Sequence, residues 1–327
     1  MSVPPSPTSA TTPAIPVWIA VDPASITLLE QARKVAVTRS TVLIRGESGT
    51  GKDLLAACIH YLGAELRARE HSGAAELQDP LLTVDCASLP EELMESELFG
   101  YEPGAFTGAT QTKRGRLEMA AEGTVVFDEV AALNPSMQAK LLRVIEDKKF
   151  YRLGSSIARP LPLQARVIAL TNHDLAQAVK RGEFRDDLYH RLNVIPLEVP
   201  PLRARRSDIP PLAGHLLGQL RGSRDIRLTP EAVKALEVYS LPGNVRELRN
   251  ILERAMFQTD GKVIGPEHLP AAVQSSAPSK PQSLAELERA HIEFVLDFCR
   301  GKKSKAAEIL GITRKTLLDK RKKYGLG

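Results

Sequence analysis

A glycine-rich segment that follows an apolar run and precedes a helical pattern has the spacing of a phosphate-binding loop. It consists of Gly46, Glu47, Ser48, Gly49, Thr50, Gly51, Lys52 and Asp53. Glycines let successive backbone N–H groups surround phosphate oxygens, and the N-terminus of the following helix adds a favourable field. Lys52 would reach the outer phosphates, whereas Asp53 stands where the general pattern has the serine or threonine that binds magnesium. The segment predicts a nucleotide site, and a purely structural glycine turn is the alternative.

Two acidic residues at the end of a second apolar run supply the matching metal chemistry. Asp128 can hold a magnesium ion, directly or through water, and Glu129 is placed to polarise an attacking water molecule. Asn172 ends a further apolar run and can sense the terminal phosphate. The alternatives are an exposed acidic turn for the pair and an ordinary turn residue for the asparagine.

Three arginines are candidates for contact with phosphate. Arg185 and Arg191 lie six residues apart, and a guanidinium group supplied by a neighbouring subunit can stabilise the charge that develops on phosphoryl transfer. Surface ion pairing with an adjacent aspartate is the alternative for Arg185. Arg246 lies in the first turn of a helix that Asn244 is expected to cap, against the preference of the helix dipole. Contact with a nucleotide phosphate would explain that position.

Between the phosphate loop and the acidic strand end lies a segment that cannot build a core helix. Its residues are Gly104, Ala105, Phe106, Thr107, Gly108 and Ala109. Small residues around one phenylalanine and one threonine predict a thin, bendable loop with an apolar tip. Inside a domain that hydrolyses nucleotide, such a tip is expected to touch a partner protein when ATP is bound.

The C-terminal end of the chain has the charge and pattern of a DNA-binding unit. The net charge is +5, but ten basic and two acidic residues fall between Arg300 and Lys323, so the remainder is slightly acidic. Residues 303–317 read as helix, tight turn at Gly311, and helix, which is the plan of a helix-turn-helix with a recognition helix for the major groove. The residues expected to face DNA are Lys305, Thr313, Arg314, Lys315, Thr316, Lys320 and Arg321. A structural helical hairpin or a solvated basic tail is the alternative.

The elements that must position these residues form an α/β pattern. Apolar runs at 41–45, 81–85, 124–128, 167–171 and 193–199 alternate with helical patterns such as 54–62, 136–147 and 174–181, which predicts a parallel sheet with helices on both faces. From the composition and from the prolines and glycines that end helices and strands, we expect five segments. These are a disordered leader over 1–22, the α/β core over 23–200, a small helical lid over 201–272, a linker over 273–283 and an all-α unit over 284–327.

Composition excludes several classes of protein. No run of about 18 apolar residues exists, so no membrane span is expected. The N-terminus lacks a signal pattern, which favours a cytoplasmic location. Cys58, Cys86 and Cys299 are too widely spaced for a zinc cluster or a disulfide framework and are expected to be buried thiols.

With these segments in view, the chain closely resembles the sigma-54-dependent transcriptional activators, the bacterial enhancer-binding proteins of the AAA+ class. The resemblance runs from about Pro23 to Gly327. Its most specific part is Glu97 to Pro103 leading into the loop at 104–109.

The resemblance implies an AAA+ phosphate-loop ATPase that uses ATP and Mg²⁺. Lys52 would be the phosphate-loop lysine, and Asp128 and Glu129 would serve the magnesium ion and the attacking water. Asn172 would be the first sensor of the nucleotide, and Arg246 the second.

The resemblance also implies partners. Protomers would form a ring, often a hexamer, in which Arg185 and Arg191 act as fingers in the neighbour's site, which reverses the surface interpretation of Arg185. Phe106 and Thr107 would touch sigma-54, and hydrolysis would remodel the closed complex of the sigma-54 RNA polymerase holoenzyme into an open one. Residues from Leu284 onward are similar to the Fis-type helix-turn-helix that binds double-stranded enhancer DNA.

The sequence departs from the family pattern at three positions. Asp53 stands where members usually have glutamate, Asp85 where they have an asparagine thought to restrain the catalytic glutamate, and Leu241 where they have tryptophan. An acid at position 85 near Glu129 is expected to raise one of the two pKa values by like-charge repulsion. These changes motivate an alternative function, a DNA-binding regulator with vestigial ATPase activity. A AAA+ chaperone or helicase is the third possibility, but it explains neither the apolar loop nor the helix-turn-helix.

Many relatives carry an N-terminal receiver or ligand-sensing domain. About 22 residues precede the ATPase pattern here, too few to fold as one. Regulation is therefore expected from a separate partner protein or from expression level, if it occurs at all.

Overall fold

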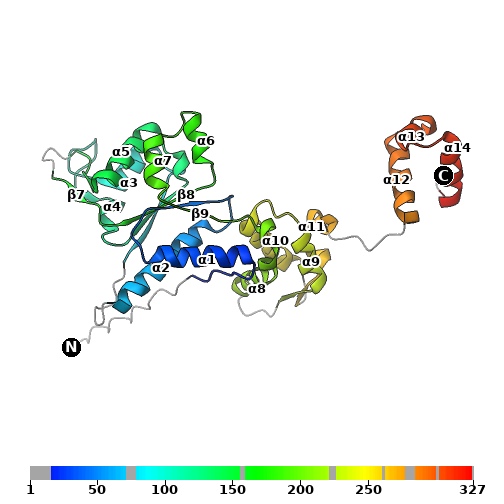
Figure 1. Cartoon of the computed structure of the whole chain (residues 1–327), viewed down its shortest axis with the longest axis horizontal. Helices are drawn as coiled ribbons and strands as arrows, with labels where there is room; N and C mark the ends of the chain where they lie inside the picture. The colour runs from blue at the N-terminus through cyan, green and yellow to red at the C-terminus, as the bar shows by residue number, and fades with distance from the viewer. Residues whose placement is uncertain are drawn as a thin grey trace. The chain divides into compact units, whose positions relative to one another are not determined.

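The computed structural model describes residues 16–70, 79–154, 159–220, 226–259, 262–276, 284–299 and 302–325. The chain divides into two compact units, residues 1–274 and 275–327, and each is described by itself. Figure 1 labels the helices of both units and some of the strands. No helix among the described residues is both long and apolar enough to cross a membrane.

A five-stranded parallel sheet forms the centre of the first unit. Its order is β2 (Leu81–Asp85), β5 (Thr124–Asp128), β8 (Arg166–Thr171), β1 (Val42–Arg45) and β9 (Ile195–Glu198). All four neighbouring pairs are parallel, so the strands end at one edge of the sheet. Apolar runs bounded by glycines or polar residues form such strands because both faces of the sheet are covered. The predicted parallel sheet is confirmed.

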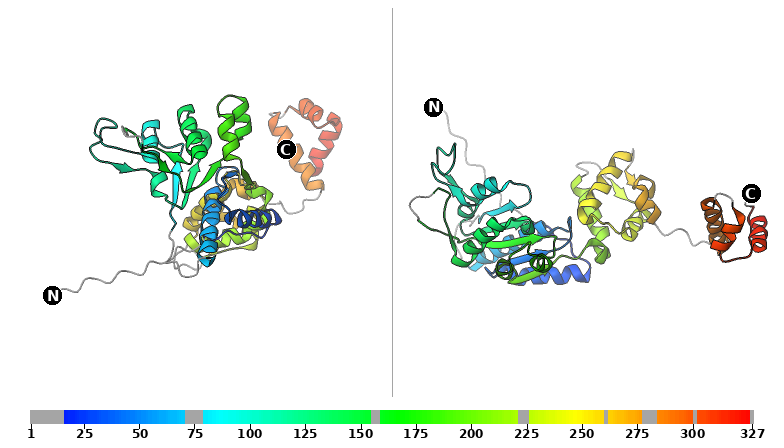
Figure 2. Two further views of the ribbon diagram at one scale, coloured as in Figure 1. Left: turned by 60° about the vertical axis from the view of Figure 1, so that its left-hand side comes forward. Right: turned by 90° about the horizontal axis from the view of Figure 1, so that it is seen from above.

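Alternate residues of each strand point to opposite faces and build two separate cores. One core contains Leu43, Val125, Phe127, Val167 and Ala169. The other contains the residues that alternate with them, Val42, Ile44, Val126, Ile168 and Leu170. Helices α1 (Pro23–Ala36) and α2 (Lys52–Glu70) cover one face. The other face is covered by α3 (Glu91–Phe99), α4 (Arg116–Met119), α5 (Pro135–Asp147), α6 (Leu175–Lys180) and α7 (Asp186–Leu192). Figures 1 and 2 show these two layers on either side of the strands.

The residues before α1 differ from the predicted leader. Residues 1–15 lie outside the described part of the chain, but Pro16 to Asp22 pack against the core. Trp18 joins the apolar cluster of α1 and α2, and Cys58 Sγ donates a hydrogen bond to the carbonyl oxygen of Pro16 at 3.3 Å. The backbone N–H groups of Val21 and Asp22 donate to Asp208 Oδ1 at 2.7 and 2.8 Å. Long-range contacts therefore order a segment whose composition alone predicts disorder.

Two antiparallel hairpins leave the α/β core. The first joins β3 (Gly100–Tyr101) to β4 (Lys113–Arg114) and carries the apolar loop. The second joins β6 (Lys149–Phe150) to β7 (Leu161–Pro162). Residue Leu153 links them, since its N–H donates to Gly100 O and its carbonyl accepts from Glu102 N, at 3.0 and 2.9 Å.

After the sheet, the chain forms the lid of the same unit. It contains two short 3-10 turns, η2 (Leu202–Ala204) and η3 (Arg206–Asp208), and the helices α8 (Ile209–Leu220), α9 (Pro230–Val238), α10 (Asn244–Gln258) and α11 (Ala271–Ser276), with a 3-10 turn η4 (Pro266–His268). Leucines spaced along these helices are fully or nearly fully buried and pack the lid together. The prediction of helices only is incomplete, because β10 (Arg227–Leu228) pairs in parallel with β11 (Val263–Ile264).

The second unit is a three-helix domain made of α12 (Leu284–Phe298), α13 (Lys303–Ile309) and α14 (Arg314–Tyr324). Its core consists of Ile292, Val295, Cys299, Ala306, Ala307 and Leu317. The small alanines let α13 and α14 cross closely, and Gly311 takes the left-handed backbone conformation in the turn between them, with φ of 65°. The predicted helix-turn-helix is confirmed.

Candidate functional site

The phosphate loop leaves β1 and enters α2 at Lys52. Its glycines are required by backbone geometry, since Gly49 and Gly51 have φ of 75° and 96°. A Cβ atom at Gly46 would lie 2.8 Å from the carbonyl oxygen of Val199, and one at Gly49 would lie 2.5 Å from that of Gly243. The loop is thus pressed between the end of the sheet and the lid.

Lys52 projects into this loop and is only 8% exposed. Its Nζ donates hydrogen bonds to the carbonyl oxygens of Gly46 and Glu47 at 3.0 and 3.2 Å. Burial lowers the pKa of Lys52, and the nearby carboxylates of Glu129, Asp128 and Asp53 oppose that effect. The predicted lysine and the predicted acidic residues therefore meet at one place.

Asp128 ends β5 directly beside Asp85, its register partner at the end of β2. Burial raises the pKa of Asp128, and the charge of Asp85 raises it further, while Lys52 lowers it. The pKa of Asp85 itself is lowered, because the backbone N–H groups of Ala87 and Ser88 donate to its carboxylate. Like-charge repulsion was expected between Asp85 and Glu129, and that assignment is wrong, because the register of the strands puts Asp128 in the neighbouring position.

Glu129 is held by the strand that ends in the candidate sensor. Its backbone is left-handed, with φ and ψ of 55°, which is uncommon for a residue with a side chain. The carboxylate accepts from Thr171 Oγ1 at 2.9 Å and from the backbone N–H of Asn172 at 3.3 Å. Thr171 is a site residue that the sequence reasoning missed, because its role depends on the pairing of β5 with β8.

Residues of the lid contact the phosphate loop from its outer side. Arg246 Nη1 donates to Ser48 Oγ at 2.9 Å. The Arg203 guanidinium forms an ion pair with Glu47 and, together with Asn244, lowers the pKa of Glu47 to about 2. The N-cap predicted at Asn244 is wrong. Gly243 is the N-cap of α10, and Asn244 is its first residue, with φ of 53° and a side chain committed to long-range contacts.

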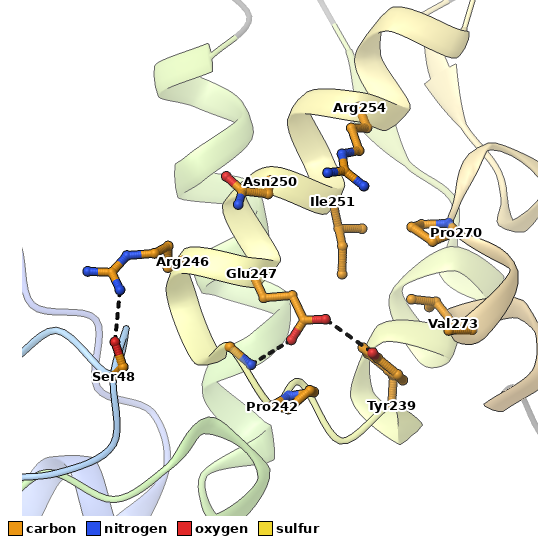
Figure 3. A pocket seen from close by; sticks show the side chains of 12 residues that line it. Ser48, Tyr239, Pro242, Arg246, Glu247, Asn250, Ile251, Arg254, Pro270 and Val273 are labelled. Carbon is orange, nitrogen blue, oxygen red and sulfur yellow. Dashed lines mark hydrogen bonds between the residues drawn. The ribbon is translucent and has the colours of Figure 1, made fainter. Parts of the chain in front are cut away.

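A cavity of about 510 Å³ lies between the phosphate loop and the lid helices. Figure 3 shows Arg246, Asn250 and Arg254 projecting from α10, with Arg246 directed to Ser48. From the same helix, Glu247 accepts from Tyr239 Oη and from the N–H of Gly243. The volume is within the range of small-molecule sites, and the lining offers both guanidinium groups and a carboxylate.

Arg185 and Arg191 are not brought to the phosphate loop by the described residues of their own protomer. Arg185 is the N-cap of α7 and forms an ion pair with Asp187, at 2.7 Å between Nη2 and Oδ2. Arg191 pairs with Glu146 at 2.9 Å. The arginine side chains are 46% and 58% exposed, so both guanidinium groups are accessible to a second molecule. The surface ion pair considered for Arg185 is thus present.

The apolar loop at 104–109 is closed at its base and open at its tip. Gly104 N donates to Ala109 O at 2.8 Å, and Ala109 N donates to Phe106 O at 3.0 Å. Phe106 is 48% exposed and meets Tyr101 edge to face, with ring centroids 4.9 Å apart. An apolar ring is thus presented at the surface on a short, internally bonded loop.

The second hairpin supports the base of the apolar loop. A Cβ atom at Gly154 would lie 2.5 Å from Ala105 Cα, so the two backbones touch. Arg152 donates to the carboxylates of both Glu102 and Glu118, at 2.6 and 2.8 Å, which joins the loop base to α4.

In the helix-turn-helix, Thr313 caps α14 by accepting from Thr316 N at 3.1 Å. Lys305, Arg314 and Lys315 are exposed. Lys320 differs from the others predicted to face DNA, because its ammonium pairs with Glu288 of α12. Arg321 is half-buried in the same helix.

Three family models match consecutive parts of the chain. The Sigma-54 interaction domain matches residues 18–198, the AAA+ ATPase lid domain matches 203–286, and the Fis family of bacterial regulatory proteins matches 283–324. These matches span the phosphate loop, the lid and the helix-turn-helix in turn.

Curated proteins and solved structures are similar over nearly the whole chain. The transcriptional regulatory protein ZraR of Escherichia coli K12 is 43% identical over 95% of this chain and 70% of its own length. The regulatory protein AtoC of the same strain is 41% identical over 93% of this chain and 67% of its length. The crystal structure of NtrX from Brucella abortus in complex with ATP is 33% identical, with a TM-score of 0.68 over 94% of this chain and 69% of that chain.

Proposed function

This chain belongs to the family of sigma-54-dependent transcriptional activators, and we propose how its residues carry out that activity. It is an ATPase and a DNA-binding activator of sigma-54-dependent transcription. The remaining steps are the assignment of the nucleotide site, of the protomer contacts and of the surface that engages the polymerase. Action on polymerase and chromosomal DNA implies a cytoplasmic location.

Lys52 and the N–H groups of the phosphate loop bind the phosphates of ATP, and Glu129 orients the attacking water. The observation that carries this assignment is the pair of hydrogen bonds from Thr171 Oγ1 and Asn172 N to Glu129, which connects this carboxylate to the strand that ends in the candidate sensor. Arg246, already directed at Ser48, is the second residue that senses the nucleotide.

Asp128, assisted by Asp53, would hold Mg²⁺ together with the nucleotide. The fit is chemical: Asp128 is a partly buried carboxylate with a raised pKa beside a second acid, and a divalent cation would compensate both charges. Mg²⁺ would supply charge neutralisation for the phosphates.

Protomers assemble into a ring, expected to be a hexamer, in which Arg185 and Arg191 reach the phosphates bound by a neighbour. Both side chains are exposed, and their ion pairs are with Asp187 and Glu146 and not with their own phosphate loop, which supports this assignment. The test is the specific ATPase activity across the assembly range of protein concentrations. We expect it to rise with concentration, and inactive Arg185→Ala protein should regain activity when mixed with Lys52→Ala protein. A flat concentration dependence would contradict the shared site.

The loop at 104–109 contacts sigma-54, with Phe106 and Thr107 at its tip. Thr107→Ala should retain ATP binding and hydrolysis but fail to open a promoter with the sigma-54 holoenzyme. Promoter melting at the wild-type rate in this variant would remove the loop from the mechanism.

The matches to the sigma-54 interaction domain and to transcriptional regulators do not favour the alternative that Asp85 and Asp53 motivated, a DNA-binding regulator with vestigial hydrolysis. Single-turnover hydrolysis separates the two functions. An active enzyme must exceed its own Glu129→Gln variant, whereas equal rates would favour the vestigial form. The double-stranded DNA contact is assigned to Lys305, Thr313, Arg314, Lys315, Thr316, Lys320 and Arg321, with Lys320 restrained by Glu288.

A further inference from the structure

Three consecutive carbonyl groups of the phosphate loop accept hydrogen bonds from outside the loop. Asn244 Nδ2 donates to Ser48 O at 3.1 Å, and Val245 N donates to Gly49 O at 2.9 Å. Arg205 Nη2 donates to Thr50 O at 2.7 Å. Arg205 lies at the start of the lid, and Asn244 and Val245 lie in its helix α10. The lid therefore fixes the orientation of three successive peptide groups of the loop.

Fixing a carbonyl also fixes the N–H of the next residue. In a planar trans peptide the C=O and the following N–H point in opposite directions. With Ser48 O, Gly49 O and Thr50 O turned toward the lid side, the N–H groups of Gly49, Thr50 and Gly51 are turned the other way, and that of Thr50 also donates to Glu47 O at 3.4 Å. These are the groups that a phosphate-binding loop uses. Glycine peptides rotate at little cost, so the loop needs outside donors to hold this arrangement.

The donor from Arg205 is itself rigidly held. Arg205 is 3% exposed, its guanidinium lies 5.4 Å from the ring centroid of Trp18, and its Nη1 is 4.0 Å from Asp208 Oδ2. Asp208 in turn accepts from Ser25 Oγ at 2.5 Å and from the N–H groups of Val21 and Asp22. The orientation of the Thr50 carbonyl is therefore tied to the segment that precedes α1.

The donor from Asn244 is held by different contacts. Asn244 is fully buried, and its Oδ1 accepts from the N–H of Leu202 at 2.8 Å. Its φ of 53° is tolerated by asparagine better than by most residues. The amide side chain thus bridges the start of the lid to the phosphate loop, and a nearly isosteric carboxylate in its place would keep the acceptor and lose the donor.

We propose that Arg205 and Asn244 are positioning residues for nucleotide, which orient the inner N–H groups of the phosphate loop by holding its outer carbonyls. This inference rests on the proposed nucleotide site. The inner N–H groups of the phosphate loop bind phosphates that ATP and ADP share. Loss of either donor should therefore weaken the binding of both nucleotides to the same extent. Loss of Arg246, assigned to sensing the terminal phosphate, should weaken ATP more than ADP.

The test is titration calorimetry of ADP and of a non-hydrolysable ATP analogue with full-length Asn244→Asp and Arg205→Lys. A hydrogen bond to a group of this kind is worth about a tenfold change in the dissociation constant, so each variant should lose about tenfold for both nucleotides. Arg205→Lys is preferred to a neutral substitution, because it keeps a positive charge beside buried Asp208. Arg203→Gln is the matched control. It removes an exposed guanidinium from Glu47 without touching a loop carbonyl, and its ADP affinity should stay close to wild type.

Two further measurements separate positioning from loss of stability. In glycine-selective ¹⁵N spectra at saturating ADP, the Gly49 amide should shift less in Asn244→Asp than in the wild type. The Gly51 amide, whose preceding carbonyl is held by Arg205, should shift equally in both proteins. The double variant Glu47→Gln, Asn244→Asp should still bind ADP weakly. It removes the repulsion between the Glu47 carboxylate and the carboxylate introduced at position 244, but it does not restore the donor to Ser48 O.

Wild-type protein that binds no ADP would refute the proposed nucleotide site itself. Wild-type binding with unchanged ADP affinity in both folded variants would refute only the positioning role. Full recovery of affinity in the double variant would refute the assignment of Asn244, because repulsion from Glu47 would then account for the loss.

Discussion

Replacement of Gly154 by alanine should separate the second hairpin from the apolar loop. A Cβ atom there would lie 2.5 Å from Ala105 Cα and 2.6 Å from Ala105 Cβ, and φ at Gly154 is 70°. Gly182 offers a matched control, because its φ is 73° and a Cβ atom there would meet no atom within 4 Å. Both substitutions carry the same backbone strain, and only Gly154→Ala adds a steric overlap.

The magnitude follows from these distances. The left-handed strain costs about 1–2 kcal/mol in each variant. Ordinary contacts are 3.4–4 Å, so Ala105 and the new methyl group must move apart by about 1 Å. Overpacking of this kind adds about 1–3 kcal/mol, which corresponds to a melting temperature about 2–12 °C below that of Gly182→Ala. Because Ala105 belongs to the loop assigned to sigma-54, this displacement should impair polymerase engagement.

The assay compares three readouts for the two variants: thermal melting, ATP hydrolysis, and retention of sigma-54 in the presence of ADP and aluminium fluoride. We expect hydrolysis to be preserved in both variants and sigma-54 retention to be lost in Gly154→Ala alone. Equal retention by the two variants would refute the idea that the second hairpin supports the loop. A parallel loss of hydrolysis in Gly154→Ala would show instead that the damage reaches the nucleotide site.

Three other predictions concern charge and burial. The pKa of Asp128 is raised in the folded protein, so its ionisation destabilises the fold. This destabilisation is absent below the ordinary pKa of 3.8 and grows as pH rises through the folded pKa. At pH 7, Asp128→Asn should therefore melt at a higher temperature and lose hydrolysis, and a lower melting temperature would contradict this. Burial raises the pKa of Cys58 to about 11 and of Cys86 to about 12, so iodoacetamide at pH 8 should label neither in folded protein and both in denaturant, as read by mass spectrometry. Substitution of Arg314 and Lys315 by alanine should reduce the slope of log affinity for DNA against log salt by about 1–2, and an unchanged slope would place these side chains away from phosphate.

The parts of the fold that sequence predicts well are those with local causes. Buried apolar runs place the five strands, and the glycine pattern places the phosphate loop between β1 and α2. The helix predicted over 54–62 extends from Lys52 to Glu70, because alanine and long polar side chains continue it past the apolar stripe.

The parts it misses depend on pairing between distant segments. Strand register, which no local pattern encodes, sets Asp128 beside Asp85 and brings Thr171 to Glu129. Asparagine is favoured at helix N-caps, yet the contacts of Asn244 with the phosphate loop outweigh that local preference. Trp18 lies in a segment whose neighbours predict disorder, and its packing against the core is long-range.

The ion pairs of Arg185 with Asp187 and of Arg191 with Glu146 have a consequence for association of the subunits. Exposed pairs of this kind contribute little to stability, so each guanidinium can exchange its carboxylate for a phosphate without a large penalty. An isolated subunit thereby keeps these charges neutralised. High ionic strength weakens the binding of an arginine to carboxylate and to phosphate alike, so it should alter formation of the proposed ring less than it alters DNA binding.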